Sequence, residues 1–158
     1  MKRLVATSAH EVSPSLSPDG KQLAYVSDET ERQEVYLRPV PGPGASVQVS
    51  VGDANQPVWA HDGRELFYRT GTPRDSMSFL VSASIVDRPS VAVVRRDTLF
   101  EDRFVAAGLH GQYDVFPNGK EFVMLKKVTV DDTTSARIVV LTNWTRELTR
   151  GTPKERPY

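Results

Sequence analysis

The stretch "PSLSPDGKQLAYVSD", from Pro14 to Asp28, sets a tight turn directly before an apolar segment. Within Pro18-Asp19-Gly20, proline presets a φ of about −65° that suits the start of a turn, aspartate can hydrogen-bond the local backbone, and glycine accepts the positive φ that closes a hairpin. The residues at 23–25 are apolar at every position, so both faces of their strand are expected to be buried. The stretch predicts a β-hairpin whose second strand lies between two other layers.

The same pattern returns twice, as "QPVWAHDGRELFYRT" at 56–70 and "QYDVFPNGKEFVMLK" at 112–126. The turn glycines Gly20, Gly63 and Gly119 lie 43 and 56 residues apart, and four-stranded propeller blades repeat about every 40 to 50 residues. The spacing predicts propeller blades, with an insertion in the longer interval. The predicted structural turns are Pro18, Asp19 and Gly20, then His61, Asp62 and Gly63, then Pro117, Asn118 and Gly119.

Each unit contains further strand-like segments after its hairpin. The first unit has "EVYLRPV" and "ASVQVSV" (45–51), and the second has "FLVSASIV" and the segment from "SVAVV" to "TLF". The third has "YDVF", "EFVMLKKV" and "ARIVVL", and "TNWTRELTR" after them predicts a short terminal helix. We therefore assign 1–10, which contains "KRLVAT", as the outer strand of a neighbouring blade, 11–53 as blade 1, 54–108 as blade 2, and 109–158 as blade 3 with the helix.

Composition argues against several classes of partner. Twenty basic residues balance twenty acidic ones, so the chain lacks the concentrated positive charge that binds phosphate backbones. Cysteine is absent, which excludes disulfides and cysteine-ligated metals. No apolar run approaches the roughly 18 to 20 residues that span a bilayer, and the first residues lack the apolar core of a signal peptide. We expect no nucleic acid, no membrane insertion of this segment and no cofactor.

Together, "SPSLSPDGKQLAYVSD", "EVYLRPVPG", "QPVWAHDGRELFYR", "YDVFPNGKEFVML" and "IVVLTNWTREL" resemble the WD40-like repeats of TolB-type six-bladed β-propellers. More narrowly, they resemble the carboxy-terminal propeller of bacterial membrane-anchored serine/threonine protein kinases. The resemblance covers nearly the whole chain and implies an all-β partial propeller of about three four-stranded blades, half of a six-bladed ring. His61 and Asn118 depart from the family's Pro and Asp, and the kinase signatures are absent.

Two histidines, His10 and His110, each precede the first strand of a unit, where propeller loops lie near the axis. They are candidates for flanking a ligand, although the alternative is that they are solvated loop residues, because no H-x-x-x-H spacing or adjacent carboxylate pair supports a metal site. The candidate binding face consists of His10, Glu11, Asn55, Gln56, His110 and Gln112.

No catalytic residue is assigned. Asp19, Asp62 and Asn118 recur in every unit, whereas an active site is needed once, so they are read as turn residues. No G-x-S-x-G elbow provides a hydrolase nucleophile. We therefore expect that this chain is not an enzyme, even if its parent protein is a kinase.

Two functions remain open. The first is a non-catalytic module for protein or ligand binding, the C-terminal sensor or interaction part of a bacterial kinase-like or TolB-like protein. The alternative is the gating propeller of a prolyl-oligopeptidase-like serine peptidase, whose chemistry lies in a separate α/β-hydrolase domain. The expected helix "NWTRELTR" favours the first. The propeller is periplasmic or extracellular within a membrane-anchored parent, and cytoplasmic if the chain is complete.

Three blades are too few to close a ring. The blade faces at Leu23 and Phe122, and at Ala24 and Val123, are apolar, so both ends of the stack are expected to expose apolar surface. In a fragment, other blades of the parent cover these faces. If the chain is complete, we expect a homodimer that forms a six-bladed ring, in which "KRLVAT" of one copy supplies the fourth strand of the other copy's third blade.

Overall fold

The computed structural model describes residues 8–42, 44–71, 77–87, 90–105, 111–130 and 133–141. All the secondary-structure elements in these ranges are β-strands, so the described chain is all-β, as the sequence predicted. The expected helix at 142–150, the strand "KRLVAT" and His110 lie outside the described residues. Within those residues there is no helix of the length and apolarity that crossing a bilayer requires.

In the described residues, three antiparallel sheets follow one another along the chain, and in each the strands pair in sequence order. Blade 1 consists of β1 (Glu11–Leu16), β2 (Gln22–Ser27), β3 (Glu34–Pro39) and β4 (Val47–Gln48). Blade 2 consists of β5 (Ala54–Trp59), β6 (Glu65–Thr70), β7 (Phe79–Val86) and β8 (Ala92–Glu101). Blade 3, in the described residues, consists of β9 (Tyr113–Val115), β10 (Phe122–Val130) and β11 (Thr133–Leu141).

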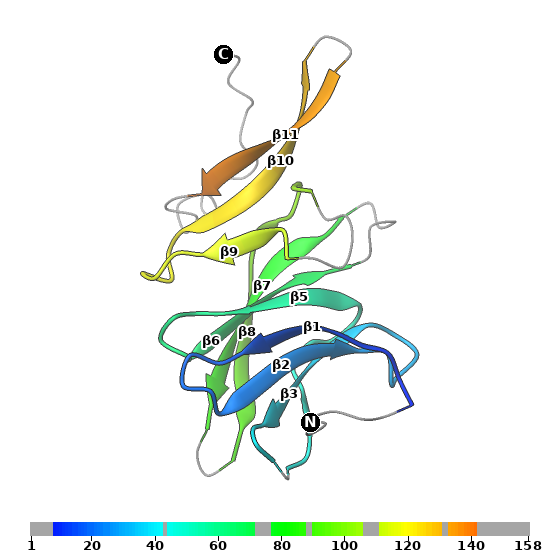
Figure 1. Cartoon of the computed structure of the whole chain (residues 1–158), viewed down its shortest axis with the longest axis vertical. Coiled ribbons are helices and arrows are strands. Elements are labelled where there is room, and N and C mark those ends of the chain that lie inside the picture. The colour runs from blue at the N-terminus through cyan, green and yellow to red at the C-terminus, as the bar shows by residue number, and fades with distance from the viewer. Residues whose placement is uncertain are drawn as a thin grey trace.

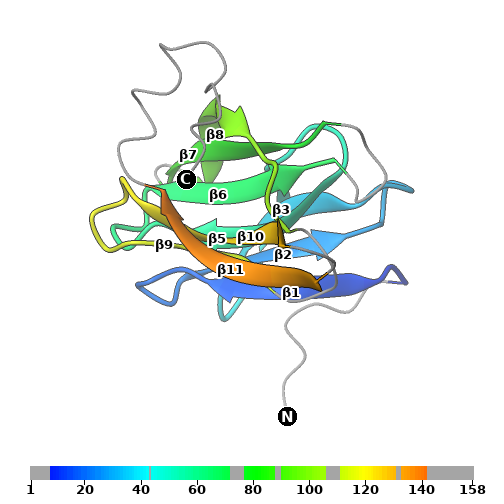
Figure 2. The same cartoon turned by 90° about the horizontal axis from the view of Figure 1, so that it is seen from above.

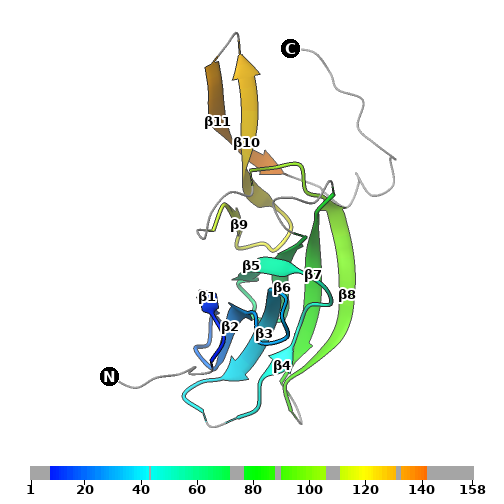
Figure 3. The same cartoon turned by 90° about the vertical axis from the view of Figure 1, so that its right-hand side faces the viewer.

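The sheets are stacked along the longest axis of the molecule (Figure 1). β5 contacts both β1 and β9, so the first strands of the three sheets are neighbours. Seen along the stack, β7 and β8 lie on the side away from β1 (Figure 2), and the side view shows β8 along the outer margin (Figure 3). Successive meander sheets with neighbouring first strands form a partial β-propeller of three blades.

Two apolar cores lie between the blades. The core between blades 1 and 2 contains Ala24 of β2 and Leu66 of β6. The core between blades 2 and 3 contains Phe67 of β6 and Phe122 of β10, whose rings meet edge to face at 5.0 Å between centroids. Because successive residues of a strand point to opposite faces, Leu66 and Phe67 belong to different cores. The middle blade is therefore buried on both faces, as its uninterrupted apolar pattern predicted.

The hairpin turns have one geometry. Gly20, Gly63 and Gly119 have φ values of +72°, +70° and +65°. Each glycine N–H donates to the carbonyl three residues earlier, at 2.8, 2.9 and 2.8 Å. The Asp or Asn before each glycine accepts a bond from the N–H two residues later, at 3.0, 2.9 and 2.9 Å. His61 and Asn118, where the sequence departs from Pro-Asp-Gly, do not alter this geometry.

The outer strands account for the unequal repeat lengths. The strand expected at 45–51 is only two residues long, because the chain leaves the ladder after Gln48 and the N–H groups of Val49 and Ser50 both bond the carbonyl of Val35. In blade 2, β7 has eight residues and β8 has ten. The longer interval therefore holds longer outer strands.

The two ends of the stack differ, contrary to the expectation that both expose apolar surface. Leu23 and Tyr25 of blade 1 are only 9% and 2% exposed. They cluster with Tyr36 against Val40, and the Tyr25 hydroxyl hydrogen-bonds the hydroxyl of Ser46 at 2.9 Å. The β3–β4 connection therefore covers part of this end face. The opposite face, on blade 3, keeps exposed apolar side chains.

Candidate functional site

Arg69 is an exception in the repeat. It stands six residues after its turn glycine, at the position that holds Val26 in blade 1 and Leu125 in blade 3. Its side chain is only 1% exposed, although arginine is rarely buried unless it is paired. In blade 1 the apolar Val26 meets the packing requirement at this position, in the core between blades 1 and 2. Arg69 therefore marks a feature that belongs to blade 2 rather than to the repeat.

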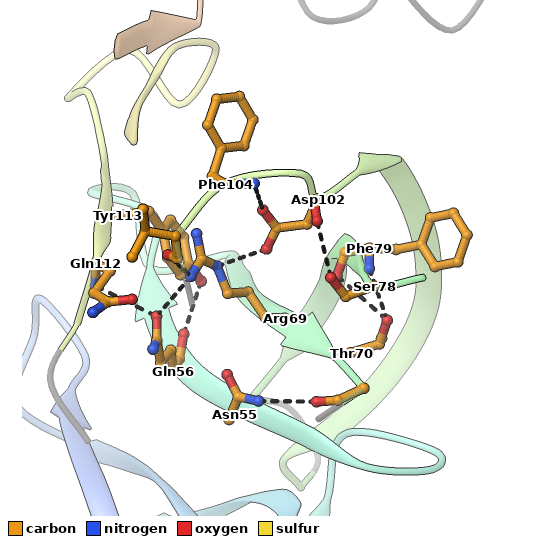
Figure 4. Close-up of polar contacts among 12 residues, drawn as sticks. Asn55, Gln56, Arg69, Thr70, Ser78, Phe79, Asp102, Phe104, Gln112 and Tyr113 are labelled. Atoms are coloured by element: carbon orange, nitrogen blue, oxygen red, sulfur yellow. Dashed lines mark hydrogen bonds and ion pairs between the residues drawn. The ribbon is translucent and has the colours of Figure 1, made fainter. Parts of the chain in front are cut away.

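An ion pair, a hydrogen bond to a carbonyl and an aromatic ring hold the Arg69 guanidinium, and Gln56 adds a longer hydrogen bond (Figure 4). Nε lies 2.7 Å from Oδ2 of Asp102, whose side chain is fully buried. Nη1 donates a 2.7 Å hydrogen bond to the carbonyl of Val105. The guanidinium carbon lies 5.2 Å from the centre of the Tyr113 ring, within the range of a cation–π interaction. Arg69 thus connects β6 with the blade 2–3 linker and with β9.

Burial dominates the electrostatics of the Arg69–Asp102 pair. Burial raises the pKa of Asp102, and the Arg69 charge and the N–H of Phe104, 3.1 Å from Oδ1, oppose that rise. Burial likewise lowers the pKa of Arg69, and Asp102 opposes the change. Nε–H does not meet hydrogen-bond geometry toward Oδ2 despite the short distance. Loss of hydration commonly outweighs attraction in buried ion pairs, so we interpret the pair as a constraint on position.

Gln56 brings the first strand of blade 2 into the same cluster. It has a positive φ of 51° in a β-bulge between Asn55 and Val58, and bulges redirect side chains. Its Oε1 accepts long hydrogen bonds of 3.4 Å from Arg69 Nη1 and from the N–H of Gln112. The Tyr113 hydroxyl, whose pKa burial raises well above its usual value, donates to the Gln56 carbonyl at 2.8 Å.

A second buried carboxylate fixes the other linker. Glu34, 4% exposed at the start of β3, accepts a hydrogen bond from the Ser50 hydroxyl and a 3.0 Å bond from the N–H of Gly52. Ser50 in turn accepts a 2.9 Å bond from the N–H of Val35. Both linkers that lead to the start of the next blade are therefore anchored by a buried acid, at positions that are not equivalent in the repeat.

The structure separates the predicted binding residues into two places. Gln56 and Gln112 meet in the Arg69 cluster, although Gln56 is only 5% exposed. Asn55, on the same bulge, donates a 3.1 Å bond to the carbonyl of Gly71. His10 and Glu11 lie at the start of β1, where the N–H of His10 donates to Asp28 at 2.8 Å. The predicted turn residues lie at the opposite ends of the strands.

Among the residues that the structure describes, no group of three His, Cys, Asp or Glu side chains forms a metal-ligand cluster. The Arg69 cluster is closed by its own partners and by burial. These contacts hold the start of β9 and the linker 102–105 in fixed positions against blade 2.

No family model and no curated protein matches the chain. Among solved structures, it is similar to a TolB-type protein from Agrobacterium tumefaciens, with a TM-score of 0.55 and 16% identity over 87% of this chain and 47% of that one. It is also similar to the β-propeller domain of the Trilobed protease from Pyrococcus furiosus, with a TM-score of 0.55 and 11% identity over 87% of this chain and 40% of that one. The fold is that of a TolB-like β-propeller.

A third similar structure is the acylaminoacyl peptidase from Pyrococcus horikoshii, with a TM-score of 0.55 and 12% identity over 78% of this chain and 18% of that one. The chain therefore spans less than half the length of each of these proteins. At such identities the similarity shows the fold alone. This chain corresponds to part of each of those longer structures.

Sequence reasoning missed Arg69, Asp102 and Tyr113. One signal was available for Arg69, because aligning the three repeats sets it in a column with Val26 and Leu125. Asp102 and Tyr113 had no comparable signal, since they reach Arg69 from 33 and 44 residues away in the chain.

Proposed function

We propose that this TolB-like propeller segment is a non-catalytic interaction module that binds a protein or a small ligand. The binding surface is the face where β1, β5 and β9 begin, named here the strand-start face. The observation that carries the proposal is that a buried acid anchors each linker arriving there, Glu34 for one and Asp102 for the other. Loops held on a rigid scaffold are the usual place for recognition.

The two ends of the strands support this choice of face. The hairpin turns at the other end repeat one geometry, as a structural element does. At the strand-start face each linker has its own sequence and its own anchor. Two exposed apolar side chains, Val51 at 78% and Met77 at 62%, lie on connections that reach this face and provide contact area for a partner.

Selection from a displayed library of random peptides tests the proposal. We expect selected peptides to lose binding when Val51→Asp or Met77→Asp is introduced. Val94→Asp is the matched control, because Val94 is also 62% exposed but lies on the outer strand of blade 2. Peptides whose binding is insensitive to both strand-start variants, or failure to select any peptide, would contradict the proposal.

A finer proposal concerns the parent protein. We propose that this segment is the C-terminal sensor or interaction part of a bacterial kinase-like or TolB-like protein, and the support for this is the resemblance of the repeat motifs. The coding sequence upstream of Met1 tests the kinase form. A membrane helix and the H-R-D and D-F-G motifs in the same frame would support it, and an upstream frame without them would reject it.

A second candidate function is supported by the peptidase structures. The TM-scores to the P. horikoshii acylaminoacyl peptidase and to the Trilobed protease propeller equal the TM-score to the TolB-type protein, at 0.55 each. Under this alternative the chain is the gating propeller of a serine peptidase. An in-frame α/β-hydrolase domain with a G-x-S-x-G motif downstream of Tyr158 would favour this alternative, and its absence would favour the interaction module.

A further inference from the structure

Blade 3 ends one strand earlier than the other two blades. In blades 1 and 2 the third strand, β3 or β7, has a fourth strand paired to its outer edge, which is β4 or β8. The third strand of blade 3 is β11, and in the described residues it pairs only with β10. The place that a fourth strand takes in the other blades is therefore the outer edge of β11.

The outer edges of blades 1 and 2 are protected against further pairing. β4 has only two residues, and the N–H groups of Val49 and Ser50 after it turn back to the carbonyl of Val35. β8 has the exposed ion pair of Arg95 with Asp97 and two shifts of register against β7. Short strands, charged side chains and bulges are the usual means of keeping a further strand from an edge.

β11 has none of these features in its backbone. It pairs with β10 over nine consecutive residue pairs without a shift of register. Its sequence, Thr133–Leu141, contains five β-branched residues, one charged residue and no proline, a composition that favours strands over turns. The outer edge of β11 is therefore long, regular and suited to pairing with another strand.

We propose that the outer edge of β11 binds an extended segment of a partner protein, which becomes the fourth strand of blade 3. Addition of a strand to an exposed sheet edge is a common mode of peptide recognition. The fourth strands of blades 1 and 2 show what occupies this place in the repeat. The edge is separate from the strand-start face, so it provides a second interaction surface.

The backbone of β11 specifies how the segment binds. In an antiparallel sheet alternate residues of a strand bond each neighbour, so about four residues of β11 direct N–H and C=O groups outward. Strands that neighbour one another in the three sheets are antiparallel in every pair that the structure describes. We expect the added segment to run antiparallel to β11 and to exchange main-chain hydrogen bonds with it.

Two exposed side chains of β11 specify which residues the segment prefers. Ile138 is 72% exposed and Val140 is 49% exposed. They are two residues apart, and therefore lie on the same side of the sheet. An added strand with apolar residues at alternate positions would cover both of them. The preferred partner is thus an extended segment that alternates apolar with polar residues.

The ten residues that precede β1 in this sequence are too short to fill the edge within one copy. β1 and β11 belong to the first and the third sheet of the stack (Figure 1), so two sheet spacings of about 10 Å separate them. Ten extended residues reach about 34 Å. After crossing about 20 Å they would leave about four residues for an edge of nine, and a segment supplied by another molecule has no such limit.

Binding of a designed peptide tests the proposal. The probe is a fluorescent nine-residue peptide that alternates valine with threonine and has a lysine at each end for solubility. Its matched control has the same side chains, but the amides along one edge are N-methylated and cannot donate to β11. We expect N-methylation to raise the dissociation constant, measured by fluorescence anisotropy, at least tenfold. The unmodified peptide should also slow amide hydrogen exchange in β11.

Two protein variants locate the peptide. Ile138→Lys should raise the dissociation constant at least threefold, because it removes an apolar contact beside the added strand. Val94→Lys, at an exposed valine on the outer strand of blade 2, should leave it unchanged. Circular dichroism of each variant checks that the fold is retained.

Three results would overturn the proposal. The first is equal affinity for the peptide and its N-methylated control, since the main chain would then have no role. The second is slow exchange of β11 in the dilute chain without peptide, which would show that the chain covers its own edge. The third is exchange of β11 that slows without peptide as the protein concentration rises, which would assign the edge to a second copy of the chain.

Discussion

Removing one charge of the Arg69–Asp102 pair leaves the other buried without its partner. For Arg69→Met we expect a loss of about 3 to 5 kcal/mol in the free energy of unfolding, measured by urea denaturation at neutral pH. Arg69→Met combined with Asp102→Asn should recover much of that loss, because no uncompensated charge remains. The control is Arg95→Met, whose ion pair with Asp97 is exposed and should contribute less than about 1 kcal/mol. Equal losses in Arg69→Met and the control would show that the buried pair has no special role.

The raised pKa of Asp102 predicts a pH dependence of known sign. Because its pKa in the fold lies above the usual 3.8, the folded state binds the proton more tightly than the unfolded state. The resulting stabilisation is complete below pH 3.8 and is lost as the pH rises through the folded pKa. We expect the difference in unfolding free energy between the wild type and Asp102→Asn to fall across that window. A difference that grows with pH would show that Arg69 lowers the pKa instead.

Residue-level prediction worked where the cause was local. Asp19 lies next to the glycine whose turn it stabilises, so neighbouring residues in the sequence are enough to predict the turn. Arg69 lies in a strand, where an isolated arginine usually points to solvent. Arg69 is buried because Asp102 and Tyr113 lie beside it. The positions of these two residues depend on how blade 3 packs on blade 2.

At the scale of elements, the hairpin turn is the unit that the blades share, and it depends on positive φ. A Cβ at Gly20 would meet nothing within 4 Å, so any cost of Gly20→Ala comes from the backbone at φ +72°. We expect a loss of about 1 to 2 kcal/mol in urea unfolding. Gly111→Ala is the control, because its Cβ also meets nothing within 4 Å and no positive φ occurs there. It should be neutral or slightly stabilising, and a Gly20→Ala variant as stable as this control would reject the role of the turn.

The pattern of apolar residues in the sequence was sufficient to predict some strands and insufficient to predict others. The apolar run around Leu66 predicted a strand buried on both faces, because its residues do not alternate between apolar and polar and neither face is therefore suited to solvent. The segment at 45–51 alternates apolar and polar residues, as a strand does, yet only Val47–Gln48 pairs with β3. The difference lies in connectivity, since that segment must also carry the chain to the start of β5. Propensity describes the residues of a segment and contains no information on where the next blade begins.

At the scale of the whole molecule, the blades are unequal in how many neighbours support them. Blade 2 lies between both apolar cores, whereas the face of blade 3 that points away from blade 2 has exposed side chains at Ile138 and Val140. Stability in stacked repeats is approximately the sum of each unit's own stability and its contacts with its neighbours. Blade 3 therefore has fewer stabilising contacts than blade 2, although β10 and β11 pair over nine residues.

This difference predicts an order of amide hydrogen exchange. In a dilute sample, the amides of β6 and β7 should exchange slowest, because they open only when both cores separate. The amides of β11 should exchange fastest among the long strands, since this strand is at an edge of its sheet and its face away from blade 2 is exposed to solvent. Mass spectrometry of peptides from each strand measures the order, with β2 as the internal reference because one of its faces joins the blade 1–2 core. Exchange of β11 as slow as that of β6 in dilute protein would mean that the outer face of blade 3 is covered within a single chain. The prediction that blade 3 is less stable than blade 2 would then be wrong.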